Sequence, residues 1–282
     1  MPSFSRRESV SKFLTLIFIT LFISGVPAFP QTAPNQSQPA GSSIPARHDS
    51  IGVTEHSTPE EIEEGRLNDI YESVARIERK GPCTPDLVQR YQSEVLPPAE
   101  KSTFSVPKNK FLFLANRDIG NCYLGQQKFE EAEASFEKIL QYAPIWPGTD
   151  DSAYPINFRQ IATAQMGQQK WGAAEQSLLK SIALFGPQIA RGEKLDAESH
   201  TEFSANYRGS RSRSYGLLAV VYFREGLIDK ALDTVENAYE EVIKYNLPAS
   251  YRSDVENIGK AIATASGNAA AQKAWAQRSA AK

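Results

Sequence analysis

Few side chains in this sequence have the types and spacing that catalysis or metal binding needs. The chain has two cysteines, Cys83 and Cys122, and three histidines, His48, His56 and His200. It contains no Gly-rich phosphate loop, no nucleophile elbow and no His-Glu-x-x-His pair. Two of the histidines lie in a segment without predicted structure, and one remaining histidine is too few for a histidine-based metal site. We therefore predict a protein that is not an enzyme and that holds no metal or cofactor.

The two cysteines admit two interpretations. In an exported chain a disulfide between Cys83 and Cys122 can persist, provided that their Cα atoms lie within about 7 Å of each other. Alternatively, each cysteine is a small buried apolar residue. The sequence leaves both interpretations open.

The charged residues favour neither nucleic-acid binding nor a carboxylate active site. The chain carries 31 Lys and Arg against 33 Asp and Glu, whereas nucleic-acid binding requires a clustered basic face. The glutamates within residues 130–137 lie beside lysines on one predicted helix, which is typical of a solvated helix face. We therefore predict no nucleic-acid partner.

The first 28 residues have the three parts of a secretory signal peptide. Basic residues precede an apolar run at 13–26, and small residues suited to cleavage end at Ala28. The run is shorter than the roughly 20 residues of a membrane span, which favours a cleaved signal. The alternative is an uncleaved membrane anchor. We expect export to the periplasm or secretion. Residues 29–57, rich in Pro, Gln, Ser and Ala, predict a disordered linker.

Residues 58–98 predict an N-terminal helical hairpin. Thr58 can cap the first helix, and Glu61 can reach back to the cap backbone. Thr84, followed by a proline, repeats this start signal. Pro97-Pro98 predicts the end of the second helix.

A repeat motif follows within residues 116–144, NRDIGNCYLGQQKFEEAEASFEKILQYAP. Its small residues let two antiparallel helices approach closely, and its aromatic residues fill the space beside them. The segment resembles the tetratricopeptide repeat (TPR), in which Leu-Gly-x-x-Tyr is followed by Ala-x-x-x-Phe and Pro. This resemblance implies an all-α fold, an α-solenoid of antiparallel helical hairpins. The matching residues are Ile119, Gly120, Tyr123, Phe129, Ala132, Phe136 and Pro144.

Two further copies resemble the motif less closely. Ala174 and Ala231 match Ala132, at intervals of 42 and 57 residues, where the TPR motif recurs every 34. The gaps predict a loop at 145–151 and an insertion at 187–210 that extends a helix or fills the groove. Gly186-Pro187 predicts the end of the second repeat. We expect repeats at about 113–146, 155–188 and 212–247, within 107–247, and capping helices at 248–282, of which the last is a cap or a frayed tail.

The resemblance also implies a candidate binding face. In TPR proteins the first helix of each repeat lines a concave groove, and some members hold a peptide carboxylate there with basic and Asn side chains. The equivalent positions are Arg117 and Asn121 in the first repeat, Arg159 and Gln160 in the second, and Arg213 in the third. Arginine suits this role because its guanidinium can bind a carboxylate through two parallel hydrogen bonds. The alternative is a solvated face whose arginines merely cover apolar surface.

The resemblance implies a non-catalytic scaffold of the exported compartment that binds another protein or peptide through the groove. Two alternatives remain. One is an accessory or small-ligand-binding helical protein associated with an envelope enzyme or transport system, with Trp146 and Trp171 in a pocket. The other is an architectural spacer that contacts a membrane through an uncleaved signal.

Overall fold

The structure is a computed structural model, and it describes residues 57–142, 153–199 and 203–280. Within these ranges every regular element is a helix, which confirms the predicted all-α class. Five predicted features lie outside the described residues: the signal peptide at 1–28, nearly all of the linker at 29–57, the closing Pro144 of the first repeat, the loop at 145–151 with Trp146, and His200.

The first hairpin begins with the predicted caps. Helix α2 (Pro59–Glu78) starts after Thr58, whose Oγ1 accepts from the Glu61 backbone N–H, and the Glu61 carboxylate accepts from the Thr58 N–H at 2.7 Å. Helix α3 (Pro85–Arg90) starts after Thr84, whose hydroxyl accepts from the Leu87 N–H. Both start signals are therefore confirmed.

The predicted helix end at Pro97-Pro98 is wrong. Helix α3 continues through a π-helical turn, η1 (Tyr91–Val95), directly into α4 (Leu96–Lys101). The Leu96 N–H bonds to the Tyr91 carbonyl, five residues back, which is the wider spacing of a π turn. The two prolines consequently lie at the start of α4, directly after the π turn.

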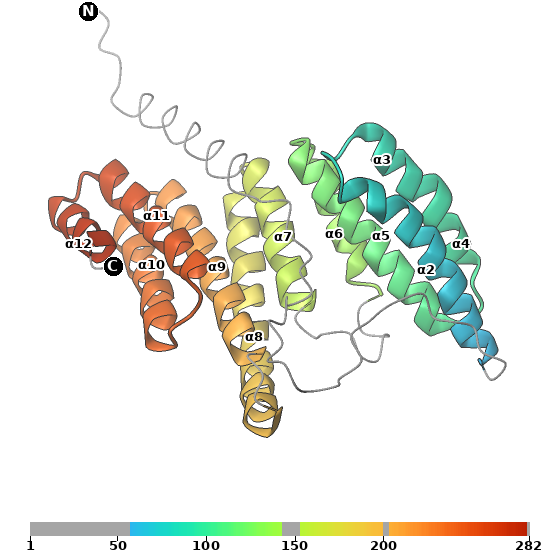
Figure 1. The fold of residues 1–282 in the computed structure, drawn as a ribbon. Helices are drawn as coiled ribbons and strands as arrows, with labels where there is room; N and C mark the ends of the chain where they lie inside the picture. Colours follow the sequence, from blue (N-terminus) through green and yellow to red (C-terminus); the bar gives the residue numbers. More distant parts are fainter. Residues whose placement is uncertain (1–56, 143–152, 200–202, 281–282) are drawn as a thin grey trace, which may run out of the picture. The chain divides into compact units, whose positions relative to one another are not determined.

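Three helical hairpins follow, one for each predicted repeat. They are α5 (Ser105–Gly125) with α6 (Phe129–Ile139), α7 (Ala153–Gly167) with α8 (Trp171–Ser199), and α9 (Phe203–Arg224) with α10 (Ile228–Lys244). Each helix packs against the next along the chain, as Figure 1 shows, and α9 also contacts α7. Helices α2 and α4 pack on α5. The series of stacked hairpins confirms the predicted α-solenoid.

The turn inside each hairpin has the same geometry in all three repeats. A residue with positive φ occupies the equivalent position each time: Gln127 at 59°, Gln169 at 60° and Gly226 at 81°. The following residue donates its N–H to a carbonyl five residues back, as Lys128 does to Tyr123, which is a Schellman-type helix end. The shared turn therefore supports the alignment of the two divergent copies with the first copy, and in this alignment Gln165 takes the place of the motif residue Tyr123.

Two further helices close the array. Helix α11 (Ala249–Ser266) packs on α9 and α10, and α12 (Ala269–Ala280) packs on α11. Trp275 on α12 is only 2% exposed. It stacks edge-on against Tyr239 and lies where Gly259 leaves room for its ring. The last helix is thus packed rather than frayed.

The predicted end of the second repeat at Gly186-Pro187 is wrong, because Pro187 lies inside the 29-residue helix α8. Buried side chains beyond the proline explain why the helix continues: Ile189 packs with Phe185 and with Tyr207 of α9. The insertion at 187–210 therefore lengthens α8 and the start of α9. In Figure 1 these gold segments continue past the end of α7.

Gly120 and Phe136 show why the motif needs a small residue on α5. A Cβ atom added at Gly120 would lie 2.5 Å from Phe136 Cε1, and the Phe136 side chain is fully buried. The ring therefore has no room to retreat, since protein interiors are closely packed. The predicted close approach of these two helices is confirmed.

We expect Gly120→Ala to lower the free energy of unfolding by about 1–3 kcal/mol, because the methyl group overpacks the α5–α6 contact. Urea denaturation followed by circular dichroism measures the change. Gly125→Ala is the matched control on the same helix, since nothing lies within 4 Å of its added Cβ. An equal loss of stability in both variants would contradict the packing argument.

Candidate binding surface on the repeat helices

Arg159 on α7 is a buried guanidinium with little compensation. Arg159 is 6% exposed, and its Nη1 donates to the Ser210 carbonyl of α9 at 2.9 Å. Within the described parts of the chain, no carboxylate forms an ion pair with it. Burial lowers the pKa of Arg159 to about 10, and the neighbouring Arg213 charge adds to this effect. Arg159 therefore remains charged at neutral pH.

Arg213 on α9 lies near Arg159 and is more accessible, with 31% of its side chain exposed. Its Nε donates to Asp254 Oδ2 of α11 at 2.9 Å, and its guanidinium lies 4.5 Å from the ring centre of Tyr251. We call Arg159 and Arg213 the arginine pair. Asp254 compensates one of the two positive charges, so the pair with Asp254 carries a net positive charge.

Asn121 and Gln160 bond to each other. The Gln160 amide donates from Nε2 to Asn121 Oδ1 at 2.7 Å, which joins α7 to α5. Both side chains are partly buried. The structure thus brings these two predicted groove residues together, and their mutual bond satisfies part of their hydrogen-bonding capacity.

Arg117, the fifth predicted residue, makes its contacts with the N-terminal hairpin and with its own helix. Its Nε donates to Asp118 Oδ1 at 2.8 Å and its Nη2 to the Tyr71 hydroxyl of α2 at 3.2 Å. Burial is the largest influence on the pKa of Arg117 and acts to lower it, but Asp118, Tyr71 and Glu78 together outweigh burial, and the net effect raises the pKa. These contacts place Arg117 in a different cluster from the arginine pair.

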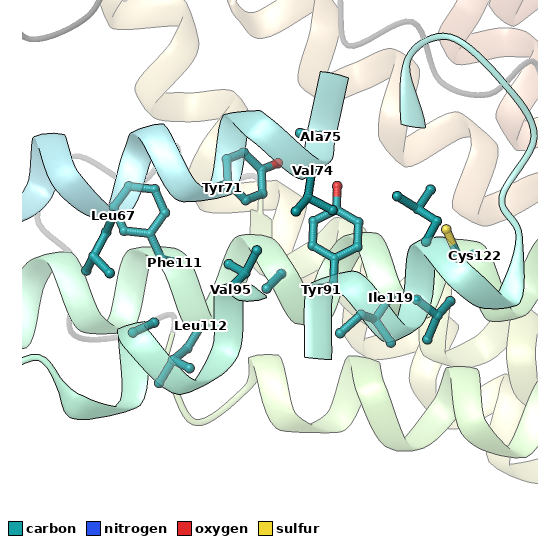
Figure 2. Packing of buried hydrophobic residues seen from close by; sticks show 14 residues of the cluster. Leu67, Tyr71, Val74, Ala75, Tyr91, Val95, Phe111, Leu112, Ile119 and Cys122 are labelled. Atoms are coloured by element: carbon teal, nitrogen blue, oxygen red, sulfur yellow. The ribbon is translucent and has the colours of Figure 1, made fainter. Parts of the chain in front are cut away.

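That cluster is a buried polar network that the sequence did not reveal. Asp118 Oδ2 accepts from the hydroxyls of Tyr71 at 2.6 Å and Tyr91 at 3.3 Å. The Tyr91 hydroxyl also lies 2.6 Å from Glu78 Oε2. Figure 2 shows both tyrosines within the apolar layer between α2 and its neighbours. One feature of the sequence could have indicated this network: Asp118 directly precedes Ile119, on the buried face of a helix.

Burial raises the pKa of Glu78 to about 7, and the charge of Asp118 acts in the same direction. Burial also raises the pKa of Tyr71 and Tyr91, again with a contribution from Asp118. Both tyrosines are therefore neutral hydroxyl donors at physiological pH. The network combines two carboxyl groups, two phenols and Arg117 at the junction of α2, η1 and α5.

Cys83 and Cys122 form a disulfide in the structure, with their Cα atoms 5.0 Å apart. Cys83 lies in the connection between α2 and α3, and Cys122 lies in α5. The bond therefore joins the N-terminal hairpin to the first repeat. Cys122 is fully buried, whereas Cys83 is partly exposed.

The predicted solvated face of α6 contains one residue with a more specific role. Glu133 accepts hydrogen bonds from Gln165 at 2.8 Å and Gln168 at 2.7 Å, and it pairs with Lys170 at 3.0 Å. Although burial opposes the shift, these donors lower the pKa of Glu133. Gln165, which replaces the motif tyrosine, thus joins the first repeat to the second.

Comparison with known proteins supports the fold. No protein-family model matches the chain, and no curated protein matches it. A kinesin light chain-like protein of Podosopora anserina with nearly identical TPR-like repeats matches with a TM-score of 0.54 at 15% identity, covering 77% of this chain and 95% of that one. A variant of that protein with one substitution matches with a TM-score of 0.55 at 17% identity, covering 77% of this chain and 94% of the variant. BtubC (BKLC) of P. vanneervenii matches with a TM-score of 0.51 at 16% identity, covering 79% of this chain and 91% of BtubC.

These similarities define the class of protein: the chain has a TPR-like helical-repeat fold. Among the described residues, no helix is both long and apolar enough to cross a membrane.

Proposed function

We propose that the chain is a non-catalytic scaffold of the exported compartment that binds a partner protein or peptide on the face carrying the arginine pair. The observation that supports this most is the state of Arg159. A buried guanidinium without a paired carboxylate is costly. A carboxylate from a partner would offset that cost, and Arg can hold it through two hydrogen bonds.

The neighbouring groups suit such a ligand. Arg213 supplies a second positive charge at a more exposed position, and Tyr251 supplies an aromatic surface under its guanidinium. Helices α7, α9 and α11, which carry these residues, lie in contact as α7–α9 and α9–α11. TPR-like folds typically act as interaction scaffolds, which agrees with this proposal.

Export is the second part of the proposal. It rests on the basic, apolar and small-residue segments of residues 1–28. A disulfide between Cys83 and Cys122 suits an oxidising compartment. Cell fractionation with an antibody against residues 203–280 would test export. Recovery of the protein only in the cytoplasm would exclude it.

Affinity capture with charge variants tests the binding face. We expect the double variant Arg159→Ala, Arg213→Ala to recover at least about 10-fold less partner than the wild type, since a buried charge-assisted contact contributes roughly 1.5–3 kcal/mol. Arg66→Ala is the matched control, because Arg66 is half exposed and pairs within α2 with Glu63. If the folded double variant recovers every partner as well as the control does, the proposed face is wrong.

A further inference from the structure

Three groups with metal-binding chemistry meet beside the polar network. The Glu78 carboxylate at the end of α2, Cys83 Sγ in the α2–α3 connection and Cys122 Sγ of α5 have ligand atoms within 4.8 Å of one another. Cys122 is buried, and the other two are partly exposed. One face of the group is therefore accessible from solvent, while the other is enclosed by the protein.

These three groups suit one kind of ion. Thiolates and carboxylates bind Zn²⁺ at about 2.3 Å and 2.0–2.2 Å respectively, so ligand atoms around one zinc ion lie about 3–4 Å apart. The Cα atoms of Cys83 and Cys122 are 5.0 Å apart. Once the S–S bond is broken, this spacing lets the two sulfur atoms lie about 3–4 Å from each other, as zinc ligands do. Harder cations such as Mg²⁺ and Ca²⁺ prefer oxygen ligands.

We propose that the reduced chain binds a zinc ion through Cys83, Cys122 and Glu78, with water in the fourth position. A dithiol reductant first gives two electrons and two protons to the S–S bond and becomes a disulfide itself. Zn²⁺ then displaces the two thiol protons, which pass to solvent, and the thiolates bind the metal. The inference is independent of the proposed partner-binding face.

The surrounding side chains would orient these ligands. The Tyr91 hydroxyl hydrogen-bonds to Glu78 Oε2 at 2.6 Å, and such outer contacts fix the direction of a metal-binding carboxylate. Gln126 Nε2 donates to the Cys83 carbonyl at 3.4 Å, while Gln126 Oε1 is buried without a hydrogen-bond partner. The Gln126 side chain therefore helps to hold the backbone at Cys83 in place.

The site would have a structural consequence. Cys83 and Cys122 are 39 residues apart in sequence, and either the disulfide or the zinc ion would join the N-terminal hairpin to α5. The oxidised chain has no free thiolate at this position and would not bind the ion. Metal binding would therefore depend on the redox state of the two cysteines.

Cobalt(II) serves as the spectroscopic probe for this site, followed by displacement with Zn²⁺. The full chain is reduced, freed of reductant under anaerobic conditions and titrated with Co²⁺. We expect thiolate charge-transfer absorption and tetrahedral ligand-field bands at one equivalent, both lost when Zn²⁺ is added. Absence of these bands in the reduced protein, or their presence in the oxidised protein, would overturn the proposal.

Variants identify the ligands. We expect Cys122→Ser to abolish the thiolate bands at one equivalent, and Glu78→Gln to weaken Zn²⁺ binding by at least about 10-fold. Glu72→Gln is the matched control, because Glu72 also lies on α2 but pairs with Arg79. Equal affinity of the Glu78 and Glu72 variants would exclude this ligand set. If reduction unfolds the N-terminal hairpin, binding is measured instead as Zn²⁺-dependent recovery of helical circular dichroism, and no recovery is equally a refutation.

Discussion

Replacing Asp118 by alanine is expected to lower the free energy of unfolding by about 3–5 kcal/mol, because removing one partner leaves a charge and polar groups without compensation in the interior. Asp118 is 1% exposed. It accepts from Arg117 at 2.8 Å and from Tyr71 at 2.6 Å. Alanine would leave the guanidinium of Arg117 without its carboxylate and the Tyr71 hydroxyl without its acceptor.

Urea denaturation followed by far-ultraviolet circular dichroism measures this change. Asp69→Ala is the matched control, since Asp69 is exposed on α2 and exposed substitutions usually change stability by less than about 0.5 kcal/mol. Asp118→Asn keeps the shape but removes the charge, so we expect an intermediate loss. A loss below about 1 kcal/mol for Asp118→Ala would show that the network contributes little to folding.

The repeat architecture was predictable because it depends on local patterns. Gly120, Tyr123 and Phe136 lie at fixed spacings that an αα-hairpin requires, and the structure packs them as the motif implies. The caps at Thr58 and Thr84 were equally local. Each of these features involves residues close in sequence or positions fixed by helical periodicity.

The helix ends at prolines were predicted less well, for a physical reason. Proline disfavours a helix interior by removing a donor and crowding the preceding turn, yet packing can outweigh this local cost. Pro187 is followed by Ile189, which is buried with Tyr207 of the next helix. Pro97 and Pro98 follow a π turn. Neither compensation is visible in the local sequence.

The candidate binding residues were also predictable only where a local motif places them. The motif placed Arg159 and Arg213 on the first helices of their repeats, and the structure brings these two residues near each other. It could not foresee that Arg117 bonds to Asp118 and Tyr71. Tyr71 and Arg117 are 46 residues apart in sequence. Such a contact depends on how the N-terminal hairpin packs on α5, which no single motif specifies.

Removing the disulfide is expected to destabilise the N-terminal end of the chain by about 4 kcal/mol at 25 °C. This magnitude follows from the chain-entropy relation for a loop of this length and the 39-residue separation of Cys83 and Cys122. The effect should be local, because each hairpin of a repeat protein contacts mainly its neighbours. The double variant Cys83→Ala, Cys122→Ala, studied with a chelator present, isolates the bond from any metal.

Hydrogen exchange followed by mass spectrometry distinguishes a local effect from a global one. We expect the amides of α2 and α3 to lose protection in the double variant, while those of α10 and α11 keep theirs. The reduced wild type with chelator is the matched comparison, since it loses the same bond without a change in side-chain volume at Cys122, which is fully buried. Uniform loss of protection across the chain would mean that the array unfolds as one unit. If protection is unchanged in both samples, packing of α2 and α4 on α5 suffices to hold the hairpin, and the disulfide contributes little to its stability.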